Sequence, residues 1–251
     1  MSAPSYSYPP VVFTGLIRDL LLLRRRDFHR DAQACVARLH PSLQVSNPEN
    51  IPQQGPCAIT VNHYHRPGFG AEWLALSISA LVSVHVHWIM TAEFMYEGKW
   101  FQPLGSSVSR ILLKRIACVY GFTCMPPMPP RPQDVQARAA SVRAVLEVVK
   151  NTREPVLGFA PEGHDASDKG VLTRPPAGVG RLGLLIVKAG LTFVPVGAYE
   201  ADGMFHLRFG EGYVLSVPSG MRAKERDRQA SKTIMEHIAF LLPPSLRGEF
   251  V

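Results

Sequence analysis

The chain has 251 residues, of which 46% are hydrophobic and 19% charged, a balance typical of a globular protein with a sizeable core. Its 27 basic and 20 acidic residues give a net charge of +7, which favours an anionic partner such as a nucleic acid, an acidic membrane surface or a phosphate-bearing substrate. Basic and aromatic residues do not alternate, so we expect no nucleic-acid partner. The four cysteines are scattered without a Cys-x-x-Cys pair, which argues against a disulfide framework or structural zinc site and indicates a reducing compartment.

The first predicted element is a leucine-rich helix over residues 11–30 that contains three consecutive arginines. Its apolar side chains recur at spacings of four, four and three, which places them on one face: Val12, Leu16, Leu20 and Leu23. Two interpretations remain open, a helix docked on the core and an amphipathic arm lying on an anionic bilayer, and both can hold for the same helix. We expect neither a signal peptide nor a transmembrane helix. We treat residues 1–45 as an N-terminal helical arm and residues 46–251 as one α/β unit.

After about residue 50, short runs typical of strands alternate with helical patterns. The predicted strands are 57–62, 84–90, 117–122, 155–160 and 191–199, followed by a hairpin of 205–210 and 213–217. The predicted helices are 135–150, 179–189 and about 221–241. The proline-rich stretch 124–134 is expected to be a loop or an ordered lid. This alternation predicts an α/β fold with a mixed, largely parallel sheet flanked by helices.

Two polar clusters directly follow predicted strands. Asn62-His63-Tyr64-His65 closes the strand at 57–62, and "FAPEGHDASDKG", residues 159–170, closes the strand at 155–160. In open α/β sheets, ligands bind at the carboxyl ends of the strands. We therefore expect the two clusters to lie together at a functional site.

These clusters resemble the motifs of the glycerolipid acyltransferase family, whose best-known members are the 1-acyl-glycerol-3-phosphate acyltransferases. The resemblance rests on Asn62-His63, on Phe159-x-Pro161-Glu162-Gly163 about 100 residues later, and on "FVPVGAY" at 193–199. It spans roughly residues 50–215. The three motifs occur in the family's order, and the resemblance implies the family's α/β fold.

The resemblance also implies a reaction. Such enzymes transfer a fatty acyl group from an acyl thioester, either acyl-CoA or acyl carrier protein, to a hydroxyl of a lysophospholipid or another lipid or polyol acceptor. His63 would be the general base, a role that suits imidazole because its ordinary pKa of about 6.5 lies near operating pH. Glu162 and Gly163 would shape the acceptor site. The reaction needs no metal and no cofactor beyond the thioester co-substrate.

The chain departs from the family pattern at its catalytic carboxylate. The family pattern Asn-His-x-x-x-x-Asp places an Asp at the position that corresponds to Gly68 of this chain. We expect Asp165 to orient His63 instead, and Glu72 is the rival candidate. Without either carboxylate, the protein would be a slow or inactive lipid-binding homologue.

The chain also departs from the family at the residues that bind the acceptor phosphate. The family's Thr and Arg are replaced by His164 and Asp165, and the carboxylate at 165 would repel a phosphomonoester by roughly 1 kcal/mol at contact range in high dielectric. Other basic residues are candidates to restore the contact, with Arg131 a possible replacement for the arginine of the family's intermediate Gly-x-Ile-x-x-x-Arg block. The full set of expected substrate-binding residues is Asn62, His65, Arg131, Glu162, Gly163, His164, Lys169, Arg174 and Arg181.

A metal-dependent hydrolase is the competing enzyme class. His63 with His65, and His85 with His87, form two His-x-His pairs, and Asp165 or Asp168 would supply an oxygen ligand. The spacing matches no established zinc pattern, so we expect no metal. We expect the protein to lie peripherally on the cytoplasmic, inner face of a membrane, through the basic residues of its arm.

Overall fold

The computed structural model describes residues 4–94, 102–128, 131–164 and 170–250. In this part of the chain, strands of one sheet follow the order β1-β7-β6-β2-β5-β3-β4. Neighbouring strands run parallel except β6 and β7, which form an antiparallel hairpin. The strands are β1 (Gln44–Ser46), β2 (Cys57–Val61), β3 (Val86–Thr91), β4 (Thr123–Met125), β5 (Val156–Phe159), β6 (Thr192–Ala201) and β7 (Met204–Phe209). The predicted mixed, largely parallel α/β sheet is confirmed.

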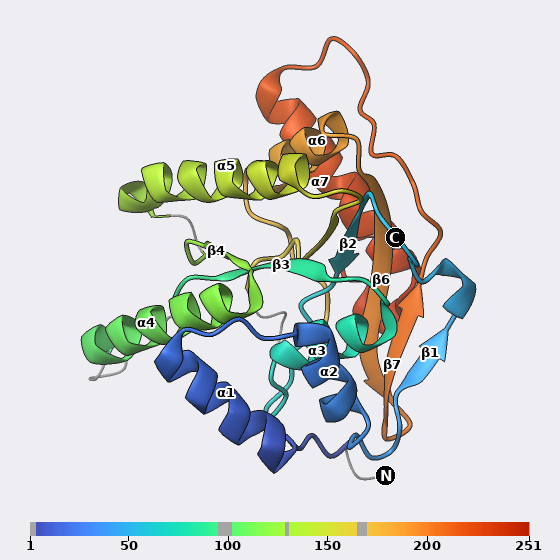
Figure 1. Ribbon diagram of the computed structural model, residues 1–251. Coiled ribbons are helices and arrows are strands. Elements are labelled where there is room, and N and C mark those ends of the chain that lie inside the picture. The colour runs from blue at the N-terminus through green and yellow to red at the C-terminus, as the bar shows by residue number, and fades with distance from the viewer. Residues whose placement is uncertain (1–3, 95–101, 129–130, 165–169, 251) are drawn as a thin grey trace.

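Helices cover both faces of this sheet. In Figure 1, α5, α6 and α7 lie on one side, and α1 to α4 lie on the other. Their bounds are α1 (Pro10–Leu22), α2 (Phe28–Val36), α3 (Glu72–Leu81), α4 (Gln102–Tyr120), α5 (Val135–Asn151), α6 (Val179–Lys188) and α7 (Ala223–Phe240). Short 3-10 helices occur at Pro48–Asn50, Pro132–Asp134 and Pro244–Leu246.

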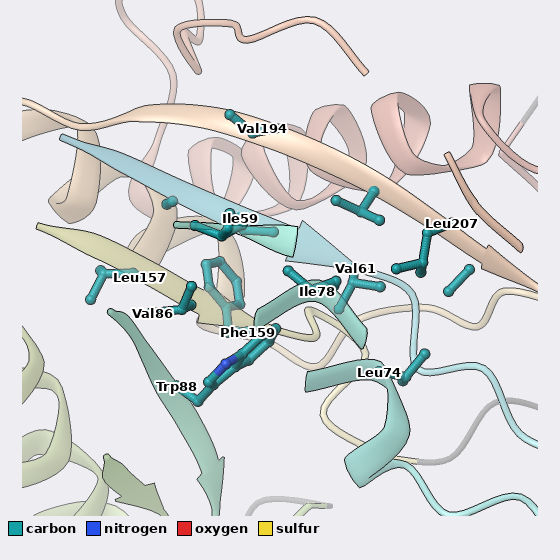
Figure 2. Close-up of a cluster of buried hydrophobic side chains, with 14 of the residues drawn as sticks. Ile59, Val61, Leu74, Ile78, Val86, Trp88, Leu157, Phe159, Val194 and Leu207 are labelled. Atoms are coloured by element: carbon teal, nitrogen blue, oxygen red, sulfur yellow. The ribbon is translucent and has the colours of Figure 1, made fainter. Parts of the chain in front are cut away.

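The central strands are apolar along their whole length because both faces are covered. Every residue of β2 and of β5 is buried, as expected for strands with helices on either side. Figure 2 shows the core gathered around them, with side chains from β2, β3, β5, β6, β7 and α3. Gly158 makes room for one of these side chains, since a Cβ at that position would lie 2.7 Å from the Trp88 ring.

The N-terminal helix is docked, in agreement with the first interpretation of residues 11–30. The Arg26 guanidinium forms ion pairs with Asp19, on α1, and with Asp31, on α2. The Tyr120 hydroxyl, at the end of α4, donates to Asp31 over 2.8 Å. Arg115, also on α4, donates to the Leu20 carbonyl in the last turn of α1 over 2.9 Å. These contacts join α1, α2 and α4, which lie side by side in Figure 1.

Two predicted strands are wrong. Residues 117–120 are the last turn of α4, which ends before Gly121 at a positive φ of 76°. The short apolar run at 117–122 did not distinguish a strand from the end of a helix, and the glycine and serines at 105–109 weakened the helical pattern before it. Residues 213–217 form no strand either, apart from a bridge between Tyr213 and Phe193.

The real hairpin joins β6 to β7. Its turn is Asp202-Gly203, and both residues have positive φ angles, 53° and 75°. Asp-Gly is a typical sequence for such a two-residue turn. The Asp-Gly pair therefore marks the position of this hairpin in the sequence itself. In the described part of the chain, no helix is long and apolar enough to cross a membrane.

His87 on β3 provides a pH test of this packing. It is buried, its Nε2 lies 2.8 Å from Thr123 Oγ1 on β4, and burial lowers its pKa to about 4. An unfolded histidine titrates near 6.5, so the unfolded state takes up the proton first as the pH falls. The stability due to neutral His87 is therefore present above about pH 6.5 and is lost towards pH 4, by up to about 3 kcal/mol.

We expect His87→Gln, which cannot titrate, to flatten this part of the pH dependence. Urea unfolding between pH 4.5 and 8 measures it, with His40→Gln at an exposed position as the matched control. If the free energies of unfolding of wild type and His87→Gln changed in parallel with pH, the assignment to His87 would be wrong.

Candidate active site

The register of β2 and β5 brings the two polar clusters together. Thr60 pairs with Phe159, so the two strands end at the same edge of the sheet. The backbone N–H of His63 donates to Glu162 Oε2 over 2.6 Å. The motifs around residues 62 and 162, separated by about 100 positions in the chain, are therefore in direct contact.

Glu162 connects three parts of this edge. Its side chain is fully enclosed, with 0% exposure. Its second oxygen, Oε1, accepts from the Thr173 backbone N–H at 2.7 Å and from the Thr173 hydroxyl at 2.9 Å. Burial raises the pKa of Glu162, and the hydrogen bonds donated by Thr173 and His63 oppose that rise. The carboxylate thus holds the turn at His63 against the segment at Thr173, and both of its oxygens are bonded within the protein.

Asn62 ties the same turn to β6, the neighbour of β2 on the other side. Its side-chain Nδ2 donates to the Ala198 carbonyl at 2.8 Å, and its Oδ1 accepts from the Ala198 N–H at 2.7 Å. The pair continues the β2–β6 ladder just beyond Val61 and Val196. Because Asn62 is fully buried and both of its polar atoms are bonded to backbone, the geometry gives it a positioning role in place of a substrate contact.

His63 and His65 are half-buried and His164 is exposed. Gly170, the next described residue after His164, returns to this turn: a Cβ there would lie 2.7 Å from the Tyr64 ring and 3.5 Å from the His65 carbonyl oxygen. The second polar cluster therefore leaves the sheet beside His63 and comes back beside His65.

The structure tests one of the two carboxylates expected to serve His63. Glu72, the first residue of α3, accepts a hydrogen bond from the Tyr8 hydroxyl in the N-terminal segment. The Glu72 carboxylate is therefore hydrogen-bonded to the N-terminal segment. Asp165 lies outside the described residues, as do Asp168 and Lys169. Gly68 is exposed and has a φ of 81°, a left-handed conformation that suits glycine.

The arginines expected to bind phosphate are largely engaged elsewhere. Arg131 forms ion pairs with the buried Glu93, at 2.7 Å, and with Asp134, at 2.5 Å. Arg174 forms a two-pronged pair with Glu249 on the surface. Arg181, on the first turn of α6, is exposed, and its backbone N–H donates to Asp227.

A pocket of about 150 Å³ adjoins the Glu162 loop. It lies between the ends of β3, β4 and β5 and the N-terminal turns of α5 and α6, and most of its lining is apolar. Gly163 forms part of its wall and has a φ of 68°; a Cβ there would lie 2.9 Å from Met128 Cγ. Gly163 is thus where the motif loop meets the pocket.

Sequence reasoning missed two residues here. Thr173 supplies two of the three hydrogen bonds to Glu162, and no motif marked it. Arg138 lines the pocket from α5, but its sequence position resembled an ordinary exposed residue of an amphipathic helix. A residue of either kind is found only when the loop or helix around it is placed in three dimensions.

The described residues include no group of three or more His, Cys, Asp or Glu side chains arranged to hold a metal ion. His87 is bonded to Thr123, and His85 stacks on the Phe122 ring with centroids 6.2 Å apart. Burial lowers the pKa of both histidines. The pair at 85 and 87 thus belongs to the packing between β3, α4 and β4.

Comparisons with known proteins agree with this arrangement. The sequence profile of the acyltransferase family matches residues 42–199, which is more than half of the chain. The crystal structure of the 1-acyl-sn-glycerophosphate (LPA) acyltransferase PlsC from Thermotoga maritima is similar in fold, with a TM-score of 0.53 and 16% sequence identity, over 89% of this chain and 86% of that one. A search of curated protein sequences gave no match. The motifs, the fold and the family profile agree, and the chain belongs to the acyltransferase family.

Proposed function

We propose that this acyltransferase moves a fatty acyl group from an acyl thioester, acyl-CoA or acyl carrier protein, to a hydroxyl of a lysophospholipid or another lipid or polyol, with His63 as the general base. The observation that best supports the proposal is the hydrogen bond from the His63 backbone to Glu162, because it joins the two motif blocks at the carboxyl edge of the sheet.

In the proposed reaction, His63 takes the proton of the acceptor hydroxyl as its oxygen attacks the thioester carbonyl carbon. The new C–O bond forms and a tetrahedral oxyanion results. When that intermediate collapses, the C–S bond breaks, and the proton held by His63 passes to the leaving thiolate. Atoms and charges balance without a cofactor or a metal.

The surrounding hydrogen bonds fit this role for His63. Asn62 ties the turn to β6, and Glu162 ties it to Thr173, so the backbone that bears the imidazole is held from two sides. General bases act efficiently only when they are placed within hydrogen-bond reach of the proton. In this proposal Asn62, Glu162 and Thr173 are positioning residues, and Asp165 remains the candidate to orient the imidazole.

We also propose that the protein lies on an anionic membrane surface at the inner, cytoplasmic face. Support comes from exposed apolar side chains on the adjacent helices α1 and α4, namely Val11, Phe13, Ile17, Leu21, Leu22, Leu104, Val108, Ile111 and Leu112. Exposed basic residues accompany them: Arg18, Arg24, Arg25, Arg110 and Lys114. A surface with apolar and basic side chains together is typical of interfacial binding to anionic lipid.

His63→Ala is expected to lower kcat by about 10²- to 10⁴-fold, because that is the usual contribution of a positioned general base. Release of free thiol from acyl-CoA, followed with a panel of hydroxylated acceptors, measures the change. His40→Ala, at an exposed position, is the control and should keep full activity. Equal rates for wild type and His63→Ala would remove His63 from the mechanism.

Glu162→Gln is expected to lower kcat by about 10- to 100-fold with little change in KM for the thioester. The amide NH2 of glutamine would face an N–H donor from His63 or Thr173, so a charge-assisted hydrogen bond is lost. Thr173→Val should have a smaller effect, since it removes only the hydroxyl bond. Glu147→Gln, exposed on α5, is the control. A rise in KM at constant kcat would instead indicate a direct substrate contact.

Ile17→Glu combined with Leu21→Glu is expected to abolish sedimentation with vesicles of phosphatidylglycerol and phosphatidylcholine. Arg24→Gln with Arg25→Gln should weaken binding by about 1 kcal/mol per charge on these vesicles only, with no change on pure phosphatidylcholine. Phe240→Ser on α7, where Phe240 is 79% exposed, controls for loss of an exposed apolar side chain. Binding that survives the α1 variants would show that the membrane surface lies elsewhere.

A further inference from the structure

Arg138 lines the pocket beside the Glu162 loop. It is the fourth residue of α5, and it lines the pocket together with Gly163 and Met128. Its side chain is half-buried. A guanidinium in such surroundings is costly to desolvate unless it finds a partner, and burial here does lower its pKa.

The partners that the structure gives Arg138 are weak for a buried cation. One nitrogen donates to the Pro127 carbonyl at 3.0 Å, and another donates to the Met128 sulfur at 3.4 Å. Thioether sulfur is a poor acceptor, and a guanidinium carries five N–H groups. Among the described residues, no carboxylate forms an ion pair with Arg138. Arg131 and Arg174, by comparison, both form ion pairs with carboxylates.

Burial is the main cause of the lowered pKa of Arg138; the nearby Asp134 favours its charged form, and Arg131 disfavours that form to a smaller extent. Glu93 pairs with both Arg110 and Arg131, and Asp134 pairs with Arg131, so these two carboxylates balance these two arginines and the remaining positive charge is that of Arg138. The N-terminus of the 17-residue helix α5 adds its positive dipole end within one turn.

The pocket also has an apolar part. Phe159, Val142 and Leu182 are among its lining residues. At about 150 Å³ it is smaller than the roughly 300–1,000 Å³ of a typical pocket for a drug-sized ligand, so it would hold only part of an amphiphile.

We propose that Arg138 anchors a subsite for the phosphate group of one of the two reactants, with the adjoining aliphatic part of that reactant against the apolar wall of the pocket. The assignment rests on the proposed function, because that function supplies reactants with phosphate groups: CoA or the carrier-protein prosthetic group on one side, and a lysophospholipid acceptor on the other. Guanidinium binds phosphate through two parallel N–H bonds, which the free N–H groups of Arg138 allow.

The subsite is connected to the catalytic turn by direct contacts. Arg138 touches Met128, and Met128 lies against Gly163. Gly163 follows Glu162, whose carboxylate bonds to His63. A phosphate held at Arg138 would therefore fix its molecule next to the loop that positions the base.

Direct binding tests the proposal without turnover. The full-length protein is titrated calorimetrically with n-octyl phosphate and, separately, with n-octanol. We expect Arg138→Gln to weaken n-octyl phosphate binding about 10- to 100-fold, as the loss of a charge-assisted contact implies, and to leave n-octanol binding unchanged. Arg143→Gln, an exposed arginine on the same helix, should bind like wild type.

Equal n-octyl phosphate affinity of wild type and Arg138→Gln would overturn the proposal, and so would a wild type that binds n-octyl phosphate no better than n-octanol. These results stand even if no thiol is ever released, so failure of the subsite and failure of the acyltransferase proposal are separable. In the kinetic arm, Arg138→Gln should raise KM for a phosphate-bearing acceptor or for acyl-CoA, and the affected reactant identifies the source of the phosphate. A short thioester without phosphates should show no change. If no KM changed, the subsite would be refuted.

Discussion

The edge of the sheet at His63 depends on the buried carboxylate of Glu162. It accepts from the His63 backbone on one side and from Thr173 on the other, so it closes a loop of chain across the ends of β2 and β5. A fully buried carboxylate is tolerated only when its oxygens are satisfied, and here three donors converge on it. Because Glu162 is enclosed, its carboxylate acts on the protein itself. It orders the backbone that carries the His63 imidazole.

A second constraint comes from the sheet itself. Because β2 lies between β5 and β6, the turn at Asn62 and His63 can be held by both neighbours at once. Asn62 uses a side chain to extend the β2–β6 ladder, and Glu162 reaches across from the end of β5. The pocket at Gly163 then opens on the next strand along, towards β3 and β4. In the proposed mechanism, this arrangement would separate the residues that hold the base from the residues that face a ligand.

Much of this arrangement was predictable from local patterns. The alternation of apolar runs with helical periodicity predicted the sheet class, and the strand ends at residues 62 and 160 predicted which clusters would meet. The end of α4 was missed because Ala117–Tyr120 is apolar enough for either element, and tertiary packing of Tyr120 against Asp31 and Phe28 decides for helix. The backbone partners of Asn62 and Glu162 were not predictable, because a motif shows which residues cluster, but not whether their polar atoms face the backbone or a substrate. Arg138 and Thr173 were missed because each meets its partners, 10 or 11 positions earlier in the chain, across a loop whose path no local pattern predicts.

The docking of α1 bears on the proposed contact with a membrane. Arg26, Tyr120 and Arg115 tie the helix to α2 and α4 before any lipid is present. Many amphipathic arms fold only on the bilayer and lose conformational entropy at that moment, which weakens their binding. A helix already anchored by ion pairs avoids that loss, and the protein would meet the bilayer as a rigid body. The orientation of the sheet edge above the lipid headgroups would then be a fixed property of the fold, set by two arginines and a tyrosine far from the reacting atoms.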